Sequence, residues 1–130
     1  MNLEILENEF TVCKITSTDQ IDFSKQFVFL SKTPDEISLV CESESVPSNT
    51  TAIESGWKAL RVSGELDFGL IGIIAKISNL LADAQISVFV ISTFNTDYIL
   101  LKAEHLDRAT AILSKNGYAL NAALQSPSAG

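Results

Sequence analysis

Two polar turns hold the residues of this chain whose types and spacing could do chemistry. The first is Gly64–Gly72 (GELDFGLIG), which places glycines and two carboxylates just before a helical apolar pattern. Free N–H groups at a helix N-terminus favour a carboxylate or a phosphate, and glycine lets the backbone approach a ligand closely. A tight turn with close helix–sheet packing would use the same residues. The first turn alone therefore leaves both interpretations open.

The second turn is Thr93–Asp97 (TFNTD), which offers hydroxyl, amide and carboxylate groups at the end of a β-rich segment. Asn and Asp often make hairpin turns for conformational reasons alone. Two polar turns at neighbouring strand ends nevertheless predict a shared site. Asp97 would then meet a cationic group and the helix N-terminus would meet a carboxylate. A small molecule that carries both groups is an amino acid.

The sequence contains no pattern typical of catalysis or metal binding. A Ser or Cys nucleophile needs a base beside it, and the single histidine, His105, has no partner of this kind. Cys13 and Cys41 lie in apolar strand patterns without CxxC spacing, which indicates core residues and too few ligands for zinc. We therefore expect no enzyme activity, no cofactor and no metal site.

Composition and charge limit the classes of partner. The net charge is −7, from 16 acidic and 9 basic residues, and such a surface repels phosphate backbones and anionic lipid. Nucleic acid and membrane are therefore not expected as partners. The longest apolar runs are far shorter than the roughly 20 residues that span a bilayer. Because no signal-type segment follows Met1, the expected location is cytoplasmic.

The elements that would position the two turns are clearest in the C-terminal half. Trp57–Ser63 alternates apolar with polar residues and predicts a strand. Helical spacing follows, and Asp67 is placed to be its N-cap. The apolar stripe of this helix consists of Leu70, Ile73, Ile74, Ile77, Leu80, Leu81 and Ala84.

The rest of this half predicts two strands, a helix and a last strand. Ile86–Thr93 is β-rich and favours a central strand buried on both faces, with Tyr98–Lys102 as its hairpin partner. A second helix then stops at Asn116-Gly117, before a strand at Tyr118–Leu120. The apolar face of that helix consists of Leu106, Ala109, Thr110 and Leu113. The sum is an α+β fold with the βαββαβ order of ferredoxin-like proteins.

The N-terminal half predicts a stripped copy of the same pattern. Its expected strands are Phe10–Ile15, Phe27–Thr33 and Ile37–Cys41, with one turn of helix at Asp19–Gln26. The polar stretch Glu42–Thr51 stands where a second helix would be. Since no helix covers this sheet, its apolar face is expected to be buried by the second lobe or by another subunit. The expected domains are a truncated lobe at 1–50, a complete unit at 51–121 and a loose tail at 122–130.

The segment GELDFGLIGIIAKISNLLADAQISVFVISTFNTDYILLK resembles the ACT domain, in the variety found in small bacterial ACT-domain proteins and in the CASTOR arginine sensors. ISVFVISTFNTDYIL is similar to the strand–turn–strand signature of that family. Phe10–Lys14 and Thr33–Cys41 resemble the degenerate N-terminal half of the same group. The resemblance covers about residues 10–120.

This resemblance implies antiparallel sheets packed with helices and a regulatory module that binds a small molecule, usually an amino acid, between ACT units. The ligand-binding residues that it implies are Asp67, Phe68, Gly69, Leu70, Ile71, Thr93, Phe94, Asn95 and Asp97. Asp97 matches the residue of the arginine sensors that faces the cationic end of the ligand. Those sensors have four ACT units and this chain has at most two. A complete interface would therefore need a second subunit, which predicts a homodimer or a higher homo-oligomer. The alternative is an assembly or interaction module with a vestigial pocket and no ligand.

Overall fold

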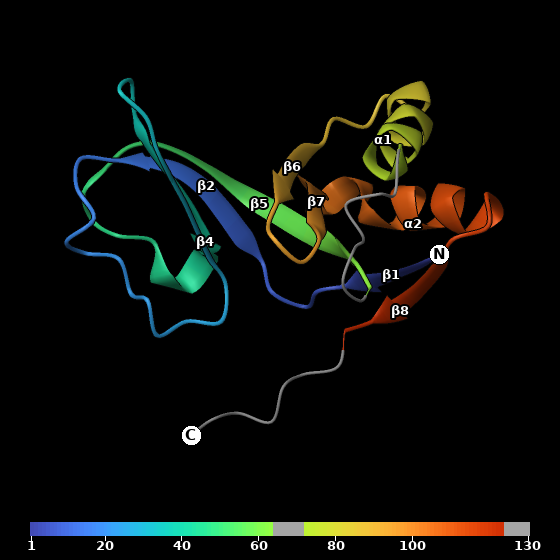
Figure 1. Ribbon diagram of the computed structural model, residues 1–130, viewed down its shortest axis with the longest axis horizontal. Coiled ribbons are helices and arrows are strands. Elements are labelled where there is room, and N and C mark those ends of the chain that lie inside the picture. The colour runs from blue at the N-terminus through green and yellow to red at the C-terminus, as the bar shows by residue number, and fades with distance from the viewer. Residues whose placement is uncertain (64–71, 124–130) are drawn as a thin grey trace. The chain divides into compact units, whose positions relative to one another are not determined.

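The computed structural model describes residues 1–63 and 72–123 and divides the chain into two compact units (Figure 1). We call the first unit, Met1–Glu7 with Lys58–Gly130, the helical unit, and the second, Asn8–Trp57, the strand unit. Strand β5 (Thr50–Val62) begins earlier than the predicted Trp57 and contributes residues to both units. The division of the chain at 1–50, 51–121 and 122–130 stays a proposal beside these two units.

In the described residues, the sheet of the helical unit has the strand order β6-β7-β5-β1-β8. Strand β1 pairs antiparallel with β5 and parallel with β8, and β6 pairs antiparallel with β7. The bounds are β1 Asn2–Ile5, β6 Phe89–Ser92, β7 Asp97–Lys102, β8 Ala119–Ala122, α1 Ile73–Asp83, α2 Leu106–Lys115 and a 3₁₀ turn, η2, at Ala103–His105. The order β5-α1-β6-β7-α2-β8 confirms the predicted ferredoxin-like fold.

Strand β1 is an addition that the sequence did not predict. It lies between β5 and β8, the first and last strands of the βαββαβ order, with Leu3 opposite Val62 and Ile5 opposite Leu60. Leu3 is fully buried in the core of the unit. The extra strand therefore widens the sheet and lengthens the surface on which the helices pack.

The core of the helical unit lies between its sheet and its two helices. Helix α1 buries Ile77 and Leu81, and α2 buries Ala109 and Leu113. These side chains pack with Leu60 and other strand residues in one cluster. The predicted apolar face of α1 is confirmed from Ile73 onward, while Leu70 lies outside the described residues. The predicted face of α2 is confirmed, as is its end before Asn116-Gly117.

Two expectations about this unit are wrong. The two-sided central strand is β7, in which Ile99, Leu100 and Leu101 are each 0% exposed, because β7 lies between β6 and β5. Strand β6 is short, and β7 is its only strand partner in the described part of the chain. Helix α1 begins at Ile73, and its N-cap is Gly72, whose φ is +78°. The prediction that Asp67 is the N-cap of this helix is therefore wrong. Asp67 itself lies outside the described residues.

The strand unit has the order β3-β4-β2-β5 and, in the residues described, contains one short 3₁₀ turn, η1 (Ser43–Ser45). Its strands are β2 Phe10–Ile15, β3 Val28–Lys32 and β4 Ile37–Glu42, as predicted to within a residue or two. The expected turn of helix at Asp19–Gln26 is absent from this described segment. The carboxylate of Asp22 accepts a hydrogen bond from the Ser24 N–H at 3.0 Å, which favours a turn over a helix.

Connecting segments cover part of the strand unit's sheet in place of helices. Cys13, Ile15, Leu39 and Cys41 form the core of this unit, and the partly buried Ile21 and Val46 pack against it from the loops. The sequence predicted that a second lobe or subunit would bury this apolar face. The unit's own loops cover at least this part of it.

The strand unit repeats the strand order of the helical unit. The order β3-β4-β2 corresponds to β6-β7-β5, and each hairpin is followed by a 3₁₀ turn. Thr33 N–H donates to the Glu36 carbonyl at 2.9 Å, and Thr93 N–H donates to the Thr96 carbonyl at 2.9 Å. The N-terminal half is therefore a stripped copy of the C-terminal half, as the sequence indicated.

Candidate functional site

The turn between β6 and β7 carries the predicted site residues that the structure describes. Ser92 and Asp97 face each other at its base, and Thr93 N–H donates to the Thr96 carbonyl. The Thr93 hydroxyl donates to the same carbonyl at 3.0 Å. These bonds close the hairpin tightly and fix the backbone between the two strands.

Thr96 ties this turn to the neighbouring strand. It is 6% exposed, and its hydroxyl donates to the Val62 carbonyl at 2.7 Å. Val62 is the last residue of β5, two positions before the predicted Gly64–Gly72 turn begins. The structure thus places Thr93–Asp97 against the end of β5. Thr96 was not among the predicted site residues, because a threonine within a polar turn carries no signal of its own.

The side chains at the tip of the turn are available to a ligand. Phe94 is 77% exposed, Thr93 and Asn95 are exposed, and Asp97 is half-buried. Within residues 1–63 and 72–123, the Asn95 amide and the Asp97 carboxylate have no hydrogen-bond or ion-pair partner. An amide and a carboxylate without a described partner therefore stand two residues apart on a hairpin that backbone hydrogen bonds close.

Arg61 of β5 is paired with a carboxylate of β1. Arg61 donates from its guanidinium to the Glu4 carboxylate at 2.9 Å, and this hydrogen bond lowers the pKa of Glu4 and raises the pKa of Arg61. The Arg61 guanidinium carbon also lies 6.0 Å from the centroid of the Tyr98 ring. Arg61 is thus in contact with both Glu4 and Tyr98, the residue that follows Asp97.

The other five predicted residues, Asp67, Phe68, Gly69, Leu70 and Ile71, lie outside the described residues. For the prediction that the two turns form one site, the structure therefore describes one part, the contact between Thr96 and Val62 at the end of β5. In the described segments, no group of three or more His, Cys, Asp and Glu side chains could hold a metal ion.

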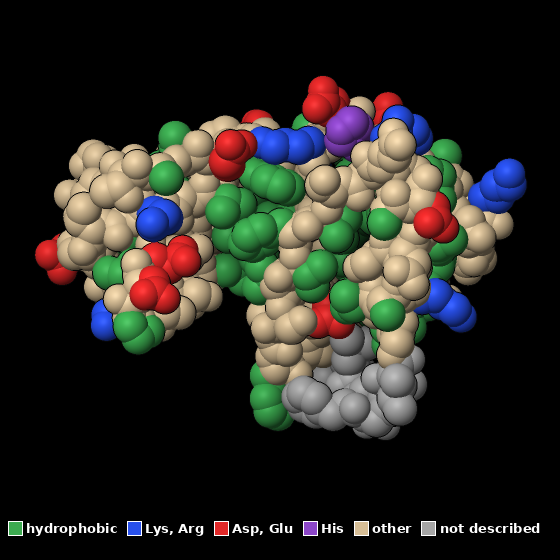
Figure 2. Space-filling view, turned by 90° about the horizontal axis from the view of Figure 1, so that it is seen from above, with side chains coloured by type: hydrophobic (Ala, Val, Ile, Leu, Met, Phe, Trp, Pro, Cys, Tyr) green, Lys and Arg blue, Asp and Glu red, His purple; other side chains and the backbone are tan. Residues whose placement is uncertain are grey.

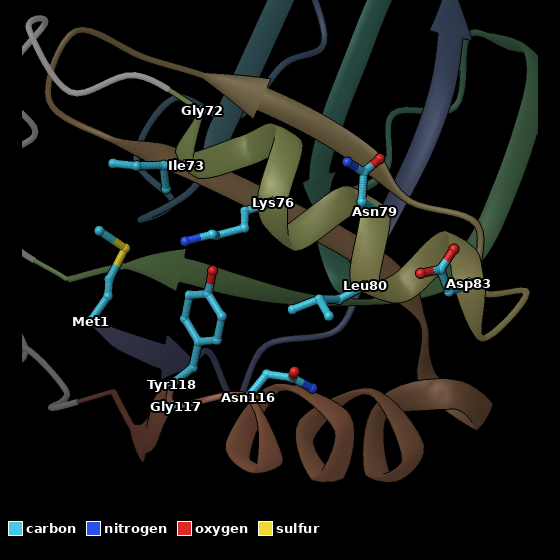
Figure 3. Close-up of a pocket in the computed structure, with 10 residues that line it drawn as sticks. All are labelled: Met1, Gly72, Ile73, Lys76, Asn79, Leu80, Asp83, Asn116, Gly117 and Tyr118. Atoms are coloured by element: carbon cyan, nitrogen blue, oxygen red, sulfur yellow. The ribbon is translucent and has the colours of Figure 1, made fainter.

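A separate hollow of about 520 Å³ lies between α1 and the C-terminal end of α2 (Figure 3). Its lining residues are Met1, Gly72, Ile73, Lys76, Asn79, Leu80, Asp83, Asn116, Gly117 and Tyr118. Of the predicted ligand-binding residues that the structure describes, Thr93, Phe94, Asn95 and Asp97, none is among them.

The surface charges do not indicate a polyanionic partner. Figure 2 shows acidic and basic side chains interspersed on the face that it displays, without one continuous basic area. No helix within the described ranges is long and apolar enough to cross a membrane.

Comparison with known proteins identifies the family. Residues 52–115, which include both predicted turns, match the sequence profile of the ACT domain. This chain is an ACT-domain protein. In its ACT domain, β5 is the first strand and the Thr93–Asp97 turn joins the second strand to the third.

The ACT-domain protein is related in sequence to the CASTOR arginine sensors. It is 32% identical over 107 residues to a human protein named putative protein CASTOR3P. The aligned part covers 71% of this chain and 66% of the human protein. It is 34% identical over 86 residues to the human cytosolic arginine sensor for mTORC1 subunit 1, which covers 61% of this chain. The match spans only 26% of the length of that sensor.

Solved structures share the fold of this ACT-domain protein over most of its length. A protein from Agobacterium tumefaciens has a TM-score of 0.82 and 25% identity, covering 95% of this chain and 94% of its own. A protein of unknown function from Vibrio cholerae has a TM-score of 0.65 and 22% identity, with 88% of each chain covered. The ligand-free regulatory subunit of aspartate kinase from Thermus thermophilus has a TM-score of 0.59 and 7% identity, with 87% and 95% covered. The last two show the fold alone.

Proposed function

We propose that this ACT-domain protein is a regulatory module that binds an amino acid. The observation that carries the proposal is the Thr93–Asp97 turn, which holds an unpaired amide and carboxylate, in the described part of the chain, against the end of the first ACT strand. The proposed ligand-binding residues are Asp67, Phe68, Gly69, Leu70, Ile71, Thr93, Phe94, Asn95 and Asp97.

The chemistry of these residues supports an amino acid as the ligand. Asp97 offers a carboxylate to an ammonium or guanidinium group, and such a charge-assisted hydrogen bond contributes about 1.5–3 kcal/mol. The backbone N–H groups of Gly69 and its neighbours would donate hydrogen bonds to the ligand carboxylate. Relatives named as arginine sensors support the same class of ligand.

The proposed mode of action is a change of assembly rather than catalysis. A second subunit would complete the pocket, so the active form would be a homodimer or a higher homo-oligomer. Ligand would shift the equilibrium only through its different affinities for two states. We propose a cytoplasmic protein without enzyme activity and without a cofactor, whose partner is neither nucleic acid nor membrane.

Thermal unfolding with each of the twenty amino acids tests this function. An amino acid present at 100 times its Kd should raise the free energy of unfolding by about 2.7 kcal/mol. Asp97→Asn should remove most of that gain, because it removes the charge and keeps the shape. Asp35→Asn is the matched control, since Asp35 is an exposed carboxylate in the corresponding hairpin of the strand unit. An absence of response to every amino acid at millimolar concentrations would overturn the proposal.

The alternative function is an assembly or interaction module with a vestigial pocket. Strand β3 favours it, because β4 is its only strand partner among the described strands and its Leu30 is 39% exposed. Such an edge can pair with another chain. If Asp97→Asn changed the oligomer size and no amino acid changed the stability, assembly would be the better description.

A further inference from the structure

The hollow between α1 and the end of α2 has the size and composition of a small-molecule site. Its volume of about 520 Å³ falls in the range of roughly 300–1,000 Å³ that is usual for ligand pockets. Apolar side chains of Ile73 and Leu80 line it beside polar side chains from two separate parts of the helical unit, α1 and residues 116–118. None of its described lining residues is Thr93, Phe94, Asn95 or Asp97, the proposed amino-acid contacts that the structure describes. The inference below is argued from the lining of the hollow and uses none of these four contacts.

The polar groups of the hollow fall into a cationic and an anionic part. Figure 3 shows the side chains of Lys76 and Tyr118 extending toward one another from opposite walls, with Leu80 beside Tyr118 on the α1 side. An ammonium and a phenol hydroxyl can both donate to one anion. Lys76 is exposed, and no described residue pairs with its ammonium group.

Asp83 supplies the negative charge at the other end. It stands in the last turn of α1, and Figure 3 shows Asn116 extending toward that end from α2. The C-terminal end of a helix carries partial negative charge, so the carbonyl groups around Asn116 also favour a cation. Within the ranges described, the Asp83 carboxylate has no partner.

The spacing of the two charges defines the length of the ligand. Lys76 and Asp83 are separated by seven helical positions, which at a rise of about 1.5 Å per residue is roughly 10 Å along α1. Leu80 lies between them on the same wall. A molecule with two adjacent charges would reach only one of these groups. A molecule with an aliphatic chain between its charges would reach both and cover Leu80.

We propose that this hollow binds a dipolar aliphatic molecule, with a carboxylate at Lys76 and Tyr118 and an ammonium or guanidinium group at Asp83. Binding would place the aliphatic middle of the ligand on Leu80 and Ile73. The site is contained in one helical unit and needs no second subunit.

Three probes with six carbon atoms each test the proposal directly. 6-Aminohexanoate carries both charges, hexanoate lacks the cation and hexylamine lacks the anion. Titrations followed by amide chemical shifts should show saturable binding of 6-aminohexanoate, with the largest shifts in residues 76–83 and 116–118. Hexanoate and hexylamine should each bind at least about tenfold more weakly, because each loses one charge-assisted hydrogen bond.

Single substitutions assign the two ends. Lys76→Gln should abolish the preference of the site for 6-aminohexanoate over hexylamine. Asp83→Asn should abolish the preference of the site for 6-aminohexanoate over hexanoate. Lys32→Gln, at an exposed lysine of the strand unit, is the control and should leave all three affinities unchanged. Asp97→Asn should also leave them unchanged, which separates this site from the amino-acid site proposed above. Equal affinities for the three probes, or no saturable binding at millimolar concentrations, would overturn the proposal.

Discussion

At the scale of single residues, Thr96 has the largest effect on the geometry of the candidate site. Its hydroxyl is the described side-chain link between the β6–β7 turn and the last residue of β5. The residues that would touch a ligand, Asn95 and Asp97, stand on either side of it. A ligand contact can be strong only when its group is already held in place. Thr96 is therefore a positioning residue for the site.

Thr96→Val should lower the free energy of unfolding by about 1 kcal/mol, because it keeps the shape and removes the buried hydrogen bond to the Val62 carbonyl. Chemical denaturation measures this change. Thr51→Val is the control, since Thr51 is an exposed threonine in β5, and it should change stability by less than about 0.5 kcal/mol. If the two variants were equally stable, the bond to Val62 would not hold the turn.

At the scale of elements, β5 supports both units of the chain. Its first part pairs with β2 and its last part pairs with β1. The register between β2 and β5 shifts near Trp57. Phe10 pairs with Trp57 and Val12 pairs with Glu54, so two steps along β2 correspond to three steps along β5. The extra residue on β5 makes a β-bulge, and Gly56 there has φ +86°. The bulge lies next to the boundary between the units.

Gly56→Ala should destabilise the protein by about 1–2 kcal/mol, because a side chain disfavours the left-handed conformation. No atom lies within 4 Å of the position that a Cβ would take, so a steric clash does not contribute. Denaturation by urea measures the difference. At an ordinary strand position the same substitution would stabilise by about 0.4–1 kcal/mol. A stabilised variant would therefore show that the bulge does not require the positive φ.

At the scale of the whole molecule, the two units are stabilised in different ways. The helical unit buries apolar side chains between a sheet and two helices. The strand unit has a smaller core that includes two free thiols, Cys13 and Cys41, each 3% exposed. Burial raises the pKa of Cys13, and burial together with the neighbouring Cys13 thiol raises the pKa of Cys41 to about 12. Both thiols are therefore neutral in the folded protein at physiological pH.

The stability of the strand unit should consequently fall at alkaline pH. The pKa of Cys41 is higher in the folded chain than its ordinary value of 9.0. The buried, neutral Cys41 thiol contributes fully to the free energy of unfolding below about pH 9. This contribution is lost as the pH rises toward 12. Urea unfolding followed by the fluorescence of Trp57, the only tryptophan, reports on this unit. Cys41→Val keeps an apolar side chain and should make the decrease between pH 8 and pH 11 smaller. An identical decrease in both proteins would contradict the assignment.

The sequence by itself determined the features that depend on local periodicity. The apolar faces of α1 and α2, the polar hairpin at Thr93–Asp97 and the stripped N-terminal copy all follow from patterns within short windows. In chain order, the predicted elements make a βαββαβ fold, which the structure and the comparisons confirm. Such patterns are visible because a helix repeats every 3.6 residues and a strand every two.

Only the tertiary structure decided which elements lie next to each other. The insertion of β1 between β5 and β8, the edge position of β6 and the bond from Thr96 to Val62 each join residues far apart in the chain. The hollow that contains Lys76, Asp83 and Tyr118 is of the same kind, since its walls come from separate elements. No short window of sequence records these pairings, because the free energy that selects them comes from burial and hydrogen bonding across the folded chain.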